Sequence, residues 1–116
     1  MAMIKLMGML KRKPGMSAGE FHDYWRNVHA PLVMKQGFAR YVRKYVQCHP
    51  TRAQLVPGPN GEPAFDGIAE LWFDSIEDMH KAISDPSYMD VIHPDELKFL
   101  DFPNVVTLLV EEVSMM

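Results

Sequence analysis

Residues 16–32 carry an apolar stripe with the period of a helix. Apolar side chains recur there at steps of four, three and four residues, and we expect them to share one buried face: Phe21, Trp25, Val28 and Leu32. Ser17 and Glu20 precede this stripe with the spacing of a capping box, in which hydroxyl and carboxylate satisfy each other's backbone N–H groups. The helix is therefore predicted to begin near Ala18.

One histidine falls on this stripe. His29 lies four residues after Trp25, so it belongs to the buried face or to its edge. Pro31 follows two residues later and biases Ala30 away from helical dihedral angles. This predicts a kink or a break in the helix where His29 lies, next to unpaired backbone carbonyl groups.

Four stretches are rich in apolar, aromatic or β-branched residues and are bounded by turn residues, which is typical of strands. They are residues 3–10, 41–49, 67–73 and 105–113. Proline and glycine fill much of residues 50–66, which predicts a long hairpin loop. Ser75 and Asp78 mark the start of a second helix that runs to about Ser84, and a further short helical piece within residues 87–97 is limited by Pro94.

The predicted order of elements is β-α-β-β-α-β, which is the split arrangement of ferredoxin-like α+β folds. Such a fold has a four-stranded antiparallel sheet with helices on one face only. Tyr41, Tyr45 and His49 point to one side of the second strand, and the sequence leaves open whether this side faces the helices. Neither side of the last strand is polar enough for bulk water, so we expect a homodimer that covers the open face.

Composition narrows the classes of protein further. The 116 residues, 47% of them hydrophobic, suffice for one domain spanning residues 1–116. The net charge of -3 and the scattered basic residues argue against a nucleic-acid partner. Cys48 is the only cysteine, which excludes an intramolecular disulfide, and no apolar run resembles a signal peptide or a membrane span. We therefore expect a cytoplasmic protein with no membrane partner.

His29 is the strongest candidate for chemistry, because histidine titrates near neutrality and burial on the stripe can tune it. The alternative is a structural histidine with both ring nitrogens satisfied in the core. His49 and His93 come next, whereas His22 and His80 have polar neighbours on the predicted helices and are expected in solvent. The five histidines lack the spacing of a metal motif, so no metal is expected.

Glu70 interrupts an apolar strand and shares a face with Trp72. Its carboxylate needs a partner, either Lys5 or Arg43 in a structural ion pair, or an imidazole that it orients for acid–base work. Several aromatic side chains suit either the walls of a pocket for a flat ligand or an ordinary core: Trp25, Tyr41, Tyr45, Trp72 and Phe99. The chain has no glycine-rich phosphate loop and no nucleophile elbow, so no nucleotide cofactor and no serine hydrolase chemistry are expected.

The chain resembles the EthD family of the dimeric α+β barrel superfamily in three segments, residues 10–17, 21–32 and 66–73, and in Asp85-Pro86 and residues 95–101. The most specific match is Trp-x-x-x-His-Ala-Pro at residues 25–31. The resemblance implies a homodimer whose two sheets form a barrel, with a ligand pocket in each subunit. It also implies cofactor-free catalysis on polyketide-like or aromatic carbonyl compounds by dehydratases, cyclases, isomerases or oxygenases, with the family histidine at His29.

We hypothesise that His29 is a general base or acid acting on a small apolar, aromatic or enolisable carbonyl compound. The expected substrate-binding residues are Trp25, Tyr45, His49, Glu70, Trp72 and Phe99. Two alternatives stay open. In the first, the pocket deprotonates an electron-rich phenol or anthrone, and the carbanion reacts directly with oxygen. In the second, the dimer binds or delivers a small ligand such as haem without chemistry, a role that its ten methionines suit equally well.

Overall fold

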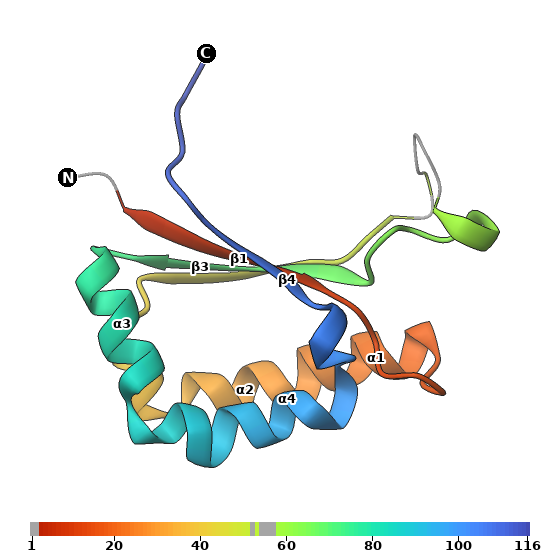
Figure 1. Cartoon of the computed structure of the whole chain (residues 1–116), viewed down its shortest axis with the longest axis horizontal. Coiled ribbons are helices and arrows are strands. Elements are labelled where there is room, and N and C mark those ends of the chain that lie inside the picture. The colour runs from red at the N-terminus through yellow and green to blue at the C-terminus, as the bar shows by residue number, and fades with distance from the viewer. Residues whose placement is uncertain (1–2, 52, 54–57) are drawn as a thin grey trace.

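The computed structural model describes residues 3–51, 53 and 58–116, so part of the predicted hairpin loop lies outside the described residues. Its sheet consists of β1 (Ile4–Leu10), β2 (Lys44–Cys48), β3 (Gly67–Phe73) and β4 (Val106–Val110). The strands lie in the order β2-β3-β1-β4, and each neighbouring pair is antiparallel. The helices cover one face of this sheet and leave the other face open (Figure 1). The predicted ferredoxin-like α+β fold is confirmed.

Two long helical segments pack on the sheet. The first consists of α1 (Ala18–Tyr24), a π-helical turn (Trp25–His29) and α2 (Ala30–Met34), and it begins with the predicted capping box. After α3 (Ile76–Ser84), the second segment repeats this plan with a π-helical turn (Tyr88–Ile92) followed by α4 (His93–Phe99). Short 3-10 turns complete the connections at Gly37–Tyr41, Pro59–Gly61 and Phe102–Asn104.

Of the kink or break predicted at His29, the break is absent, because the helix continues through a π turn there, and the predicted limit at Pro94 is wrong. Ala30 keeps helical angles (φ -61°, ψ -46°), and its N–H donates to the carbonyl of Trp25, five residues back. Pro31 and Pro94 each follow a π turn by two residues. In a regular α-helix, a proline ring clashes with the carbonyl group four residues earlier. A π turn contains one extra residue and shifts the preceding carbonyl groups, so both proline rings are accommodated.

The first π turn also decides which side chains are buried. The buried stripe has steps of four residues throughout and consists of Phe21, Trp25, His29 and Val33. Val28, predicted to be on that stripe, is 45% exposed. At about 3.6 residues per turn a four-residue step drifts around an α-helix, and the extra residue of the π turn cancels the drift. His29 thereby faces the sheet in place of Val28.

Strand bounds differ from the prediction by more than one residue at two places, the start of β2 and the end of β4. Residues 41–43 do not belong to β2, because the 3-10 turn Gly37–Tyr41 occupies the start of that stretch. β4 ends at Val110 instead of residue 113, whereas β3 has the predicted bounds.

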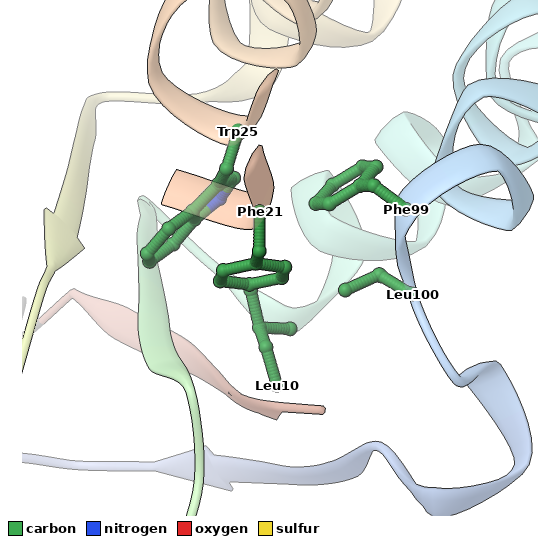
Figure 2. Close-up of a cluster of buried hydrophobic side chains, with 5 residues drawn as sticks. All are labelled: Leu10, Phe21, Trp25, Phe99 and Leu100. Carbon is green, nitrogen blue, oxygen red and sulfur yellow. The ribbon is translucent and has the colours of Figure 1, made fainter. Parts of the chain in front are cut away.

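Two apolar clusters fill the space between sheet and helices. The first consists of Leu10, Phe21, Trp25, Phe99 and Leu100 (Figure 2). The second consists of Val33, Phe38, Phe73, Ala82 and Ile92. Gly67 allows the Trp25 ring to lie against β3, because a Cβ at that position would sit 2.5 Å from the ring. Among the described helices, none is long and apolar enough to cross a membrane.

Candidate functional site

A cavity of about 280 Å³ lies between the sheet and the helices. All four strands and both π turns contribute to its walls, which are mostly apolar. The polar side chains in the walls are His29, Tyr45, Tyr88, Glu96 and Thr107. The volume is close to the lower end of the range for small-molecule pockets, so the cavity has room for one compact ligand.

His29 is 6% exposed, and its ring packs against Phe99 at a centroid distance of 4.8 Å. Its Nδ1 lies 2.8 Å from Oδ2 of Asp95, a buried residue of α4. An ionised carboxylate only accepts hydrogen bonds, so Nδ1 of a neutral ring carries the proton and Nε2 carries the lone pair. The arrangement therefore fixes the tautomer and leaves Nε2 as the basic atom of a cavity-lining imidazole.

Asp95 is anchored on both of its oxygens. The hydroxyl of Tyr24 donates to Oδ1 at 2.5 Å, and Nζ of Lys98 lies 3.8 Å from the same oxygen. Burial, followed by the hydrogen bond to Asp95, raises the pKa of Tyr24 to about 12, so the phenol keeps its proton. These contacts hold the Asp95 carboxylate against the His29 ring, as the orienting partner of an acid–base histidine requires.

Glu96 is the next residue along α4, and it lines the cavity itself. The hydroxyl of Tyr88 donates to Oε1 at 2.9 Å, and Nδ1 of His93 lies 3.1 Å from the same atom. Burial raises the pKa of Tyr88, and the charge of Glu96 adds to this effect. The cavity thus has a second polar cluster besides the one around His29.

Four of the predicted site residues come together in these walls: His29, Trp25, Tyr45 and Phe99. Tyr45 is placed there because it pairs with Leu71, and both side chains point to the helical side of the sheet. This answers the question that the sequence left open about β2. Burial raises the pKa of Tyr45, so its phenol is protonated at neutral pH.

His49 does not line this cavity. Its ring lies against that of Trp25 at a centroid distance of 4.5 Å and a tilt of 38°, and its Nδ1 lies 2.7 Å from Nδ1 of His22. Nε2 of His49 lies 2.9 Å from Oε1 of Gln47, whose amide donates to the carbonyl of Trp25. His22 is therefore half-buried and paired, contrary to prediction, whereas His80 is exposed as expected. Both paired histidines support the π turn from outside the cavity.

Glu70 and Trp72 lie on the open face of the sheet, away from the cavity, so their assignment to this pocket is wrong. Alternation places them together, but on the side opposite to Leu71. Glu70 forms an ion pair with Lys5 at 3.5 Å, one of the two structural partners that the sequence suggested. The indole N–H of Trp72 donates to Glu112 at 2.8 Å. Both residues satisfy their polar atoms without touching the cavity.

The sequence prediction missed Asp95 and Glu96 as site residues. A signal was present, because Ile92, Asp95 and Phe99 are spaced by three and four residues, which places a carboxylate on an apolar helical face. The expectation that Pro94 limits the helix hid this pattern. In the described part of the chain, no three His, Cys, Asp or Glu side chains gather where they could hold a metal ion.

Residues 13–103 match the EthD domain, and the chain belongs to the EthD family. It is 33% identical over 97 residues to the conidial pigment biosynthesis dehydratase EthD of Metarhizium robertsii, covering 78% of this chain and 68% of that protein. It is also 33% identical to the dehydratase ustZ of Ustilaginoidea virens, covering 78% and 69%. The decarboxylase dmxR15 of a Cryptosporiopsis species is 32% identical, with coverage of 78% and 66%.

Solved structures share the fold. An EthD family protein from Bacillus halodurans has a TM-score of 0.68 at 24% identity, covering 96% of this chain and 99% of that one. A dimeric protein with a ferredoxin-like fold from Bacteroides fragilis has a TM-score of 0.64 at 12% identity, covering 95% and 96%. At these identities, the likeness concerns the fold alone.

Proposed function

We propose that this protein is a small dehydratase-type enzyme in which His29 acts, without a cofactor, on an apolar aromatic or polyketide-like carbonyl compound. The observation that carries the proposal is the 2.8 Å contact between His29 Nδ1 and Asp95 in the wall of an apolar cavity. The names of the relatives add support, because dehydratases and decarboxylases both leave an electron pair on a carbon atom that a neighbouring carbonyl group stabilises. The proposed common step is the formation of an enolate.

The proposed reaction is an elimination of water from a β-hydroxy carbonyl compound. His29 Nε2 removes the proton from the carbon next to the carbonyl, a double bond forms to the β-carbon, and the bond from that carbon to the hydroxyl oxygen breaks. The proton held by His29 passes to the departing hydroxide, so the products are an unsaturated carbonyl compound and water, and the histidine is regenerated. Asp95 stabilises the imidazolium that forms in between, and the apolar walls strengthen this interaction by excluding water.

Hydrogen exchange of 1-tetralone tests the first step without requiring the natural substrate. The protons on C2 of this ketone exchange in D2O through the enolate, and NMR follows the exchange. We expect the protein to accelerate it and His29→Gln to slow it at least about tenfold, the lower range for acid–base catalysis. His80→Gln removes an exposed histidine and is the matched control. Equal exchange with wild-type and correctly folded His29→Gln protein would end the proposal.

The elimination is tested with 3-hydroxy-1-tetralone, whose loss of water gives 1-naphthol after tautomerisation. The fluorescence of 1-naphthol reports turnover continuously. The oxygenase alternative requires that turnover of a phenol or anthrone stops under nitrogen, whereas dehydration continues unchanged. The carrier alternative requires tight ligand binding with no exchange; in its haem version, a visible absorption band appears on titration.

We also propose that the protein acts as a homodimer joined through the open face of the sheet. This face exposes apolar side chains of β4, with Val106 at 47% and Leu108 at 53%. A second copy is the partner that buries such a face with two-fold symmetry. Sedimentation of the wild type should give a dimer, and Leu108→Lys should shift it toward monomer. Leu97→Lys, at an equally exposed leucine of α4, should leave the dimer intact; a monomeric wild type would contradict the proposal.

A further inference from the structure

Glu96 is the only carboxylate among the described residues that line the cavity, and its two oxygens are used unequally. Tyr88 and His93 both donate to Oε1. No described residue donates to Oε2. Every fully buried polar side-chain atom of the described chain has a hydrogen-bond partner, so Oε2, which has none, is not fully buried and can still accept a hydrogen bond.

Asp95 shows the contrasting case one residue earlier. Both of its oxygens have partners within the protein, and its side chain does not line the cavity. Asp95 therefore has no oxygen without a partner, whereas Glu96 has one. A hydroxyl group of a ligand would bind this half-buried carboxylate more strongly than a neutral acceptor, because charge-assisted hydrogen bonds are about twice as strong as neutral ones.

The His29 imidazole and the Glu96 carboxylate lie next to different apolar clusters. The His29 ring packs on Phe99 of the first apolar cluster, while Glu96 binds Tyr88, which packs against Phe38 of the second cluster at 6.0 Å. A ligand that fills the cavity thus meets the imidazole in one region and the Glu96 carboxylate in another. This arrangement suits a molecule with two polar groups on one apolar skeleton.

The cavity walls contain a carboxylate but no permanently cationic side chain among the described residues. No lysine or arginine is among the cavity-lining residues that the structure describes. Among these described wall residues, His29 is the only one whose side chain has a cationic form, and its Nδ1 is already paired with Asp95. A ligand carboxylate would lose its hydration next to Glu96 without acquiring a cationic partner, which is costly in an apolar site.

We infer that Oε2 of Glu96 accepts a hydrogen bond from a hydroxyl group of the substrate, and that the cavity selects neutral hydroxylated carbonyl compounds over carboxylates. The inference rests on the proposed function in taking this cavity as the substrate site. It narrows that function, because the hydroxyl group bound to Glu96 is a recognition group separate from the one that leaves near His29, and because decarboxylation needs the carboxylate that the walls disfavour.

Calorimetric titration with one skeleton tests this selectivity. The probes are 1-tetralone, its 5-, 6- and 7-hydroxy derivatives, and 6-carboxy-1-tetralone. We expect the best hydroxylated ketone to bind the wild type about tenfold or more tightly than 1-tetralone, which is the effect of one hydrogen bond to a charged group. The carboxylate should bind more weakly than 1-tetralone.

Two substitutions assign the effect to Glu96. Glu96→Met keeps the side-chain length and removes the acceptor, so the preference for the hydroxyl group should vanish. Glu96→Gln keeps a neutral acceptor, so it should retain part of that preference and bind the carboxylate more tightly than the wild type does. Glu77→Met replaces an exposed glutamate of α3 and is the matched control.

The two proposals fail in different ways. A hydroxyl preference that survives in Glu96→Met, or its absence from the wild type, overturns the inference even when exchange of 1-tetralone depends on His29. A wild type that prefers the hydroxylated ketone through Glu96 but exchanges no protons overturns the proposed chemistry and leaves the binding site established.

Discussion

His29 and Asp95 are 66 positions apart in the chain, and their side chains meet at 2.8 Å in the wall of the cavity. The contact joins the first helical segment to the second. It brings together a ring with a free nitrogen and a carboxylate that fixes its orientation, and the proposed acid–base chemistry rests on this arrangement.

Asp95→Asn should reduce turnover of 3-hydroxy-1-tetralone while leaving its KM nearly unchanged. Asparagine keeps the shape but removes the charge that stabilises imidazolium and fixes the tautomer, so kcat should fall at least about tenfold. Steady-state kinetics measures the effect, with Asp90→Asn, at an exposed position of the same segment, as control. A purely structural role would instead change thermal stability and leave kcat at the wild-type value.

Alkaline pH should destabilise the protein through Tyr24. Its pKa is raised to about 12 from 10.0 in the folded state, mainly by burial and then by Asp95. The folded state therefore favours the protonated phenol, and the stabilising effect is complete below pH 10 and lost as pH rises toward 12. Urea unfolding between pH 10 and 12 measures the effect. The unfolding free energy of Tyr24→Phe should fall less steeply with pH than that of the wild type, and equal slopes for the two proteins would refute the prediction.

Mild acid should destabilise the protein through the pair of His22 and His49. Burial lowers the pKa of both rings below the ordinary 6.5, and the charge of Arg26 acts in the same direction on each. The unfolded chain thus binds protons that the folded protein rejects, so stability is full above about pH 6.5 and falls below it. The two Nδ1 atoms are 2.7 Å apart, so only one proton fits between them. Charging both rings would therefore break this hydrogen bond and lower the stability further.

Urea unfolding at pH 7 and pH 5 measures this dependence. His49→Gln should reduce it, whereas His80→Gln, at an exposed position, should behave as the wild type does. An identical loss of stability in His49→Gln would show that other groups cause it.

Gly67→Ala should destabilise the fold at the contact between β3 and Trp25. The added Cβ would lie 2.5 Å from the indole ring, and relief by displacing a packed ring costs about 1–3 kcal/mol. Gly19→Ala is the matched control, because its Cβ meets nothing closer than the Ser17 hydroxyl oxygen at 4.0 Å in the first turn of α1. Equal unfolding free energies for Gly67→Ala and the wild type would contradict this packing.

Local signals in the sequence predicted the elements well. The capping box at Ser17 and Glu20 and the cap at Ser75 set the starts of two helices, and an apolar run bounded by turn residues predicted β3. These features depend on neighbouring residues only, so a single sequence contains them. The four-stranded antiparallel sheet and its open face followed from the order of the elements.

The site was less predictable, because it depends on relations that span the chain. Alternation grouped Glu70 with Trp72 but could not tell which face of β3 meets the helices. Asp95 becomes recognisable as an orienting residue only when α4 is packed beside the first helical segment. The 3.6-residue period placed Val28 on the buried face, but this period does not hold across the π turn, and Val28 is exposed.

The turn Trp25–His29 makes chemistry at this site depend on the number of residues as well as on their identity. Deleting Val28 would restore a regular α-helix and rotate the following side chains by about 100° relative to those before it. The chain would keep its histidine, its aspartate and its cavity-lining aromatic residues, yet the imidazole would no longer be in register with α4. A relative could therefore gain or lose the acid–base pair through one codon inserted or removed, a change that a comparison of residue types alone would overlook.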